Sequence, residues 1–169
     1  PVDRCAGLSC RMKPSPPLDL SLVAEARRAL EGRIRRTPVE ESGPLSEIAG
    51  ASVSLKLECF QLTGSFKIRG AVFAMTRLSG AERSQGVVTC SAGNHGKAVA
   101  HVARELSIPA EIHVPRNVDE AKYGAMLALG AVVVRSATDS FDETEEVAKA
   151  EAAASGRAYL TAFDDDAIL

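Results

Sequence analysis

From Gly86 onward, short runs of apolar residues alternate with amphipathic segments about three turns long. The apolar runs predict strands over 86–90, 110–115, 131–136 and 158–163. The segments between them predict helices over 97–108, 118–130 and 141–156. Ser140 and Glu143 have the spacing of a capping box at the start of the last helix. This alternation is typical of parallel βαβ units with right-handed crossovers, so the pattern predicts an α/β fold.

The N-terminal half has a weaker and more varied pattern. Residues 1–17 are Pro-rich and polar, which indicates a flexible leader. We expect, in order, an amphipathic helix over 18–34, an extended connection through Thr37–Pro38 and Gly43–Pro44, a strand over 51–60 and a helix over 65–78. One face of the strand would carry Val53, Leu55, Leu57 and Cys59. The last helix would bury a stripe made of Ile68, Ala71, Val72, Met75 and Leu78.

The overall composition of the 169 residues excludes several classes of partner. Hydrophobic residues make up 46% and charged residues 25%, an ordinary balance for a soluble globular protein. The formal net charge of -2 and the 4% aromatic content favour neither nucleic acid nor an anionic membrane. The apolar runs are too short to span a bilayer, and residues 1–17 have no apolar segment behind their positive charges, so we do not expect a secretory signal.

The cysteines and histidines are scattered without the pairing of a zinc site or a metalloprotease motif. They are Cys5, Cys10, Cys59, Cys90, His95, His101 and His113. We therefore expect no metal site, and reduced thiols in a cytoplasmic protein. Cys90 lies beside a candidate site but is expected to be a small buried hydrophobe.

Lys67 is the first candidate for chemistry, because it follows Phe66 in the apolar stretch LTGSFKIRGA with no acidic residue nearby in sequence. An unpaired lysine is costly to bury. If Ser65 or Thr63 caps the next helix, Lys67 lies in the first turn, where the helix dipole and partial burial favour a neutral, nucleophilic amine. An aldehyde cofactor with an aromatic ring would use these features. The alternative is a lysine that merely extends to solvent from an amphipathic helix.

The second candidate is SAGNHG at 91–96, between an expected strand and an expected helix. Unpaired backbone N–H groups at a helix start favour an anion. Gly93 and Gly96 would let the backbone approach a ligand closely. The Asn94 amide suits a phenolate oxygen, and the Ser91 hydroxyl suits a carboxylate. The alternative is an ordinary strand-to-helix turn, and the stretch is not the GxGxxG fingerprint of dinucleotide-binding proteins.

Together, TGSFKIRGA and SAGNHGKAVA closely resemble the fold-type II pyridoxal-phosphate (PLP) enzymes, in particular the serine/threonine dehydratase (threonine ammonia-lyase) and serine racemase branch. The resemblance runs from about Ala24 to the C-terminus and includes RTP, LKLE, IPAEIHVP and FDD. It implies a three-layer parallel-sheet architecture like that of the tryptophan synthase β-subunit. Residues 18–85 would belong to a large PLP-binding domain and 86–162 to a small α/β domain, and 163–169 would begin the return to the large domain.

The resemblance also implies roles for individual residues. Lys67 would form the Schiff base with pyridoxal 5'-phosphate, Phe66 would pack beside the pyridine ring, and Asn94 would bond the cofactor's ring oxygen. The substrate carboxylate would be held, mainly through backbone N–H groups, by Ser91, Ala92, Gly93, Asn94 and His95.

The implied activity is β-elimination, in which L-threonine or L-serine yields a 2-oxo acid and ammonia. The Lys67 amine would remove the α-proton as general base, while His95 is either a second base or a histidine that only bonds backbone. The resemblance implies that racemases of this branch use a serine, at the position of Ala92, as a second acid–base group. Alanine cannot carry a proton, so racemisation is disfavoured. Elimination from 3-hydroxyaspartate would need a cationic partner for the extra carboxylate, which the sequence does not identify.

Members of this branch continue for about as much chain again, with a glycine-rich loop for the cofactor phosphate and, in some, a divalent-cation site. We therefore expect these residues to be the first half of a homo-oligomeric enzyme, to bind the cofactor weakly alone and to expose apolar surface. Two alternatives come from other classes. One is an inactive fragment or regulatory module without cofactor, and the other is a Rossmann-like nucleotide binder.

Overall fold

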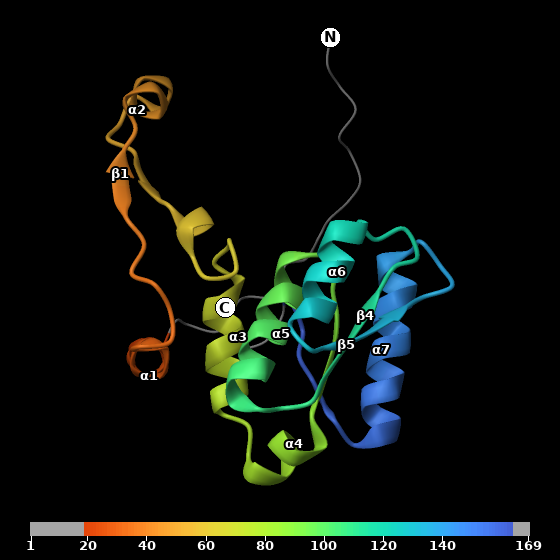
Figure 1. Ribbon diagram of the computed structural model, residues 1–169. Helices are drawn as coiled ribbons and strands as arrows, with labels where there is room; N and C mark the ends of the chain where they lie inside the picture. The colour runs from red at the N-terminus through yellow and green to blue at the C-terminus, as the bar shows by residue number, and fades with distance from the viewer. Residues whose placement is uncertain (1–18, 164–169) are drawn as a thin grey trace, which may run out of the picture.

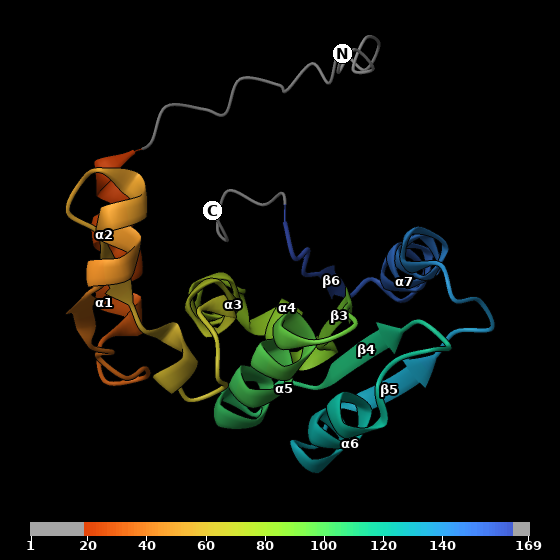
Figure 2. The same cartoon turned by 90° about the horizontal axis from the view of Figure 1, so that it is seen from above.

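The computed structural model describes residues 19–163, so the expected leader at 1–17 and the segment 164–169 lie outside the described residues. Its centre (Figure 1) is a parallel four-stranded sheet, and Figure 2 shows the strand order β5-β4-β3-β6. The strands are β3 (Val87–Cys90), β4 (Ala110–Val114), β5 (Val132–Arg135) and β6 (Ala158–Tyr159). The helices between them are α5 (Asn94–Leu106), α6 (Glu120–Ala128) and α7 (Phe141–Ser155). The α/β prediction is confirmed, although β6 is shorter than expected.

Helices cover both faces of this sheet, which gives three layers (Figure 2). On one face, α5 and α6 pack on the sheet through a cluster that includes Val99, Ile112 and Met126. On the other face, α7 contributes Ala148 and Ala152 to a smaller cluster with Val88 and Cys90. Cys90 is buried, as the sequence predicts.

Two further helices precede the sheet, α3 (Lys67–Thr76) and α4 (Gly80–Gln85). The predicted stripe of α3 is buried, apart from Leu78, which lies beyond the helix end and is half-buried. It packs against α5, so Ile68 and Met75 share one continuous core with the sheet. The predicted domain boundary near 85 runs through this core and stays a prediction.

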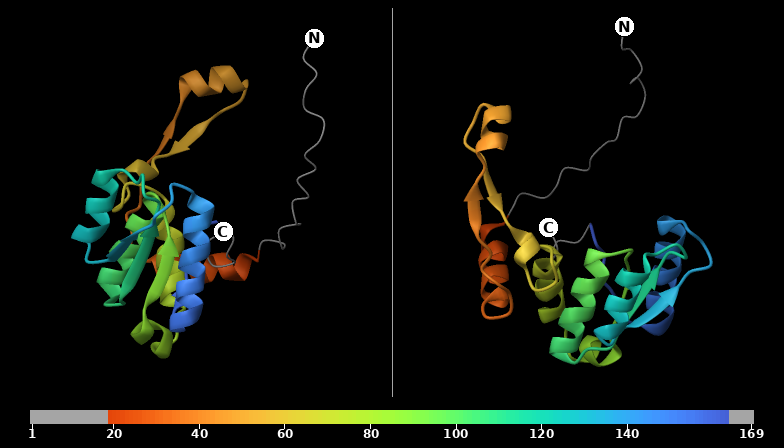
Figure 3. Two further views of the ribbon diagram at one scale, coloured as in Figure 1. Left: turned by 90° about the vertical axis from the view of Figure 1, so that its right-hand side faces the viewer. Right: turned by 45° about the horizontal axis from the view of Figure 1, so that its top comes forward.

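The remaining elements form what we call the N-terminal limb, residues 20–60, which extends away from the sheet (Figure 3). It contains α1 (Leu20–Leu30), β1 (Val39–Glu41), α2 (Gly43–Ala49), β2 (Ser54–Lys56) and the 3-10 helix η1 (Glu58–Phe60). β1 and β2 pair antiparallel. The prediction of a helix at 18–34 is confirmed with shorter bounds.

Two predictions for the limb are wrong. The segment at Gly43–Pro44 is not extended but begins α2, because Ser42 caps the helix and proline is tolerated in its first turn. The strand expected over 51–60 ends at Lys56, and Cys59 lies exposed in η1 rather than on a strand face.

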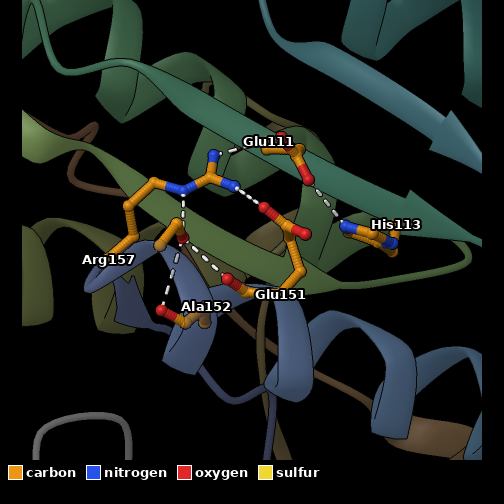
Figure 4. A network of polar contacts seen from close by, with 6 residues as sticks. Glu111, His113, Glu151, Ala152 and Arg157 are labelled. Carbon is orange, nitrogen blue, oxygen red and sulfur yellow. Dashed lines mark hydrogen bonds and ion pairs between the residues drawn. The ribbon is translucent and has the colours of Figure 1, made fainter.

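A polar network ties the end of α7 to the sheet (Figure 4). Arg157 donates to Glu111 at 3.0 Å and to Glu151 at 2.8 Å, and Glu111 also contacts His113 at 2.7 Å. Burial raises the pKa of Glu111, but hydrogen bonds from Arg157 and His113 outweigh it, so the net pKa is lowered. The carboxylate is therefore ionised and holds α7 against β4.

Candidate functional site

The candidate site lies at one edge of the sheet, where the carboxyl ends of the parallel strands β3 and β6 meet. Ligands of open parallel sheets bind at this edge. Lys67 begins α3, and its Nζ donates a hydrogen bond of 2.7 Å to the carbonyl of Ala162, just after β6. Because β6 pairs in parallel with β3, Ala162 lies beside Lys67, which is 95 residues earlier in the chain.

Aromatic faces surround the Lys67 amine. Its Nζ lies 5.4 Å from the centre of the Phe66 ring and 4.9 Å from that of Phe163. None of the ion pairs formed within residues 19–163 includes Lys67. Over that range the amine contacts a carbonyl and two rings and no carboxylate.

Two buried hydroxyls without partners precede Lys67. Thr63 Oγ1 and Ser65 Oγ make no hydrogen bond to the described residues. The prediction that one of them caps α3 is wrong, because Phe66 occupies the N-cap position and no side chain caps the helix. Unsatisfied buried hydroxyls are uncommon in folded proteins, so these two are suited to a polar ligand beside the lysine.

Within the loop 91–96, Ser91 stabilises the start of α5. Its Oγ accepts hydrogen bonds from the backbone N–H groups of Gly93, at 3.1 Å, and Gly96, at 2.8 Å. α5 accordingly begins at Asn94, three residues before the predicted start. The backbone N–H groups of Asn94 and His95 have no acceptor in residues 19–163 and remain available to an anion.

Gly96 has a different role from the predicted one. A Cβ atom there would lie 2.6 Å from Met126 Sδ and 3.1 Å from both Ile112 Cγ2 and Ser91 Cβ. The missing side chain therefore allows α5 to pack closely on α6 and β4, and does not serve the approach of a ligand. Ala92 and Asn94 are the exposed side chains of the loop.

His95 is buried under the loop. Its Nε2 lies 3.1 Å from Thr89 Oγ1, which donates its own proton to the Leu160 carbonyl at 2.6 Å. The hydrogen-bond network thus assigns the proton to Nε2 and leaves Nδ1, which is buried without a partner, as an acceptor. Burial lowers the pKa of His95 to about 4; the Leu160 carbonyl opposes this shift and the positive charge of Lys67 adds to it. His95 is therefore neutral and a weak base at physiological pH.

Sequence reasoning missed the groups that the fold brings to this site from far along the chain. Ala162 and Phe163 contact Lys67, and Thr89 and Leu160 contact His95. Only Phe163 had a signal in the sequence, because the family resemblance includes the stretch FDD that contains it.

No group of three or more His, Cys, Asp or Glu residues within 19–163 could hold a metal ion. No helix in the same range is long and apolar enough to cross a bilayer.

Comparison with known proteins identifies relatives of this chain. A model of the family described as "Pyridoxal-phosphate dependent enzyme" matches residues 30–169. The L-threonine ammonia-lyase of Thermotoga maritima is 39% identical over 152 residues, which cover 90% of this chain and 38% of that protein. The L-threo-3-hydroxyaspartate ammonia-lyase of a Pseudomonas species is 39% identical over 147 residues, covering 87% and 46%.

A solved structure, that of maize serine racemase, matches with a TM-score of 0.81 and 33% identity over 89% of this chain and 45% of that one. The chain thus spans less than half the length of each of these relatives. The family model covers most of this chain, and the matched structure shares its three-layer architecture. The chain therefore belongs to the family of pyridoxal-phosphate dependent enzymes, with the fold-type II architecture.

Proposed function

We propose that this chain carries the covalent lysine and the carboxylate-binding loop of a PLP-dependent ammonia-lyase, a threonine or serine dehydratase. The observation that supports this most directly is the Lys67 amine, which lies between two aromatic rings without a carboxylate partner in residues 19–163. The reaction would convert L-threonine or L-serine to a 2-oxo acid and ammonia. Two relatives at 39% identity bear the names of ammonia-lyases, which supports the reaction class.

The described residues fit the cofactor. Lys67 would hold it covalently, Phe66 is 58% exposed and offers its ring, and Asn94 has an exposed side-chain amide for the cofactor's ring oxygen. The unpartnered hydroxyls of Thr63 and Ser65 supply further donors beside the lysine. When bound, the cofactor supplies an electron sink for the charge that develops at the substrate α-carbon.

The protein groups would then handle binding and protons. The free backbone N–H groups of Asn94 and His95, at the positive end of α5, orient the substrate carboxylate. The Lys67 amine removes the α-proton as general base, and its protonated form becomes an acid for the departing β-hydroxyl. The rings of Phe66 and Phe163 lie beside that amine, with their centres 5.4 and 4.9 Å from Nζ. With a pKa near 4, His95 is unsuited to the role of base and instead fixes the loop to the sheet.

A second candidate substrate is 3-hydroxyaspartate. It is favoured by the Pseudomonas relative, which matches this chain at the same identity as the threonine enzyme. Racemisation is less favoured, because Ala92, exposed at the turn after β3, has no proton to deliver to the substrate. The free thiols of Cys59 and Cys90 support a cytoplasmic location. Assembly into a homo-oligomer stays a prediction.

Borohydride reduction of the protein mixed with pyridoxal 5'-phosphate, followed by peptide mapping, tests the proposal. We expect a cofactor adduct at Lys67 that is absent from a Lys67→Arg variant, while the exposed Lys122 and the other lysines stay largely unlabelled. Release of 2-oxo acid from L-threonine, L-serine and L-threo-3-hydroxyaspartate then ranks the substrates. Labelling spread evenly over surface lysines would contradict the proposed role of Lys67.

A further inference from the structure

We propose that Lys122 of α6 is a positioning residue for the substrate α-carboxylate, and that its ammonium supplies the positive charge that the loop 91–96 lacks. The inference rests on the proposed function, because that function places a carboxylate at this loop. It assigns a specific role to a residue outside both sequence motifs.

The side chain of Lys122 lies across the loop. A methyl group built on Gly93 would be 3.7 Å from Lys122 Cδ and 3.9 Å from both Cε and Nζ. The aliphatic stem thus runs over the glycine, and the ammonium ends within van der Waals reach of the same residue. A Cβ atom at position 93 would lie in ordinary van der Waals contact with this side chain, so Lys122 and the loop are direct neighbours.

The backbone of α6 fixes this placement. Lys122 lies in the first turn of α6, where its N–H donates to the capping carboxylate of Asp119 at 3.0 Å. α6 packs beside α5 on the same face of the sheet (Figure 2), and Met126, one turn further on, contacts the position of Gly96. The first turns of both helices therefore meet at the loop.

The acidic residues near Lys122 are engaged elsewhere. Glu120 pairs with Arg135 at 2.8 Å, and Asp119 caps its own helix. Within residues 19–163, Lys122 takes part in none of the ion pairs and its Nζ in none of the hydrogen bonds. An unpaired ammonium held over an anion-binding loop is suited to an anionic ligand.

The loop itself provides only neutral donors. Ser91 uses the N–H groups of Gly93 and Gly96, which leaves those of Ala92, Asn94 and His95 without an acceptor in residues 19–163. The imidazole of His95 is neutral and faces Thr89 and Leu160. Three backbone N–H groups and one lysine form a set of donors suited to a single carboxylate, and every candidate substrate carries an α-carboxylate.

Nuclear magnetic resonance titration of the chain with propionate, without cofactor, tests the inference through binding alone. We expect shifts centred on the backbone amides of Asn94 and His95. A Lys122→Met variant keeps the stem over Gly93 and should raise the Kd about fivefold, whereas Lys122→Arg should restore binding. The control Arg104→Met removes an exposed cation about three turns along α5 and should leave the Kd unchanged. Equal binding by Lys122→Met and the wild type would overturn the inference.

Steady-state kinetics of the holoenzyme provides a second readout. Lys122→Met should raise KM by a similar factor for L-threonine and L-threo-3-hydroxyaspartate and leave kcat nearly unchanged. An increase confined to the substrate with two carboxylates would overturn the assignment to the α-carboxylate. The two proposals fail separately. Propionate binding that depends on Lys122, without an adduct at Lys67, contradicts the proposed function alone. An adduct at Lys67, together with propionate binding that does not depend on Lys122, contradicts this inference alone.

Discussion

The N-terminal limb and the sheet region are built on different principles. The helices and strands of the limb contain no buried residue, whereas β3 is buried along its whole length and α5 buries most of one face. The limb packs on the core only through the partly buried Leu30 and Ile34 and is otherwise held by caps and polar contacts, whereas the sheet region is held by a continuous apolar core. Lys67 lies on α3, which packs into that core, so the reactive amine is positioned by the rigid region.

The limb is joined to α3 by a polar contact. Arg69 of α3 forms a two-pronged pair with Glu58 of the limb, at 2.9 and 2.7 Å, and Thr37 donates to the same carboxylate at 2.6 Å. This contact lies two residues along the helix from Lys67. The limb is therefore connected to α3 and the core by this ionic contact and by the partly buried Leu30 and Ile34, whereas the sheet region is connected to α3 through fully buried residues.

A matched pair of isoleucines gives the largest expected contrast. Ile112 is fully buried in β4 and Ile48 is 83% exposed in α2. Ile112→Ala should lower the free energy of unfolding by about 4 kcal/mol, because a buried cavity forms, and Ile48→Ala by less than about 0.5 kcal/mol. Urea denaturation followed by circular dichroism measures both. Similar losses would mean that the limb buries apolar surface after all.

A matched pair of glycines separates packing from backbone strain. Gly86 and Gly50 both have positive φ, 92° and 63°, but a Cβ at Gly86 would lie 2.6 Å from the Pro109 carbonyl oxygen, and one at Gly50 meets nothing within 4 Å. Gly86→Ala should cost about 3 kcal/mol, since strain and a backbone clash add. Gly50→Ala should cost about 1 kcal/mol from strain alone. The same denaturation experiment compares them, and equal costs would rule out the clash.

Sequence pattern predicted the sheet region well and the limb poorly, for a physical reason. Periodicity reports burial, so the stripe of α3 and the apolar strands were found at nearly their observed positions. Where no residue of a helix is buried, its capping residue determines where the helix begins. α2 begins at Ser42 with a proline in its first turn, and α4 begins with a capping box at Ser79, although neither has an apolar stripe.

The candidate site divides in the same way. Lys67 and the loop 91–96 are contiguous in sequence and carry their own chemical pattern, so both were identified. The roles of Gly96 and Lys122 depend on α6, and the contact of Lys67 with Phe163 depends on the pairing of β6 with β3. Such tertiary neighbours leave no signal in the local pattern.

The Glu58 contact predicts how the limb responds to acid. Hydrogen bonds from Arg69 lower the pKa of Glu58 to about 2, burial opposes this shift, and Thr37 adds to it. Because folding lowers this pKa, the stabilisation is complete above the ordinary value of 4.5 and is lost as the pH falls toward 2. We expect it to amount to about 1.5 kcal/mol at pH 7.

Glu58→Gln should therefore remove part of the pH dependence of unfolding between pH 4.5 and 2. The matched control Glu47→Gln changes an exposed carboxylate of α2 that forms none of the ion pairs within residues 19–163, and should leave the curve unchanged. Urea titrations at several pH values measure the effect. Parallel curves for the wild type and Glu58→Gln would show that the contact does not stabilise the fold.

The smallest expected effect comes from two equivalent helix caps. Ser140 caps α7 over the sheet and Ser42 caps α2 in the limb, each accepting the N–H of the third residue beyond it. Ser140→Ala should lower global stability by about 1 kcal/mol, because α7 is part of the packed core. Ser42→Ala should leave global stability nearly unchanged and instead accelerate hydrogen exchange within α2, because an element without buried residues can open on its own. Equal global losses from both variants would mean that limb and sheet unfold as one cooperative unit, and the two regions would then differ in construction but not in stability.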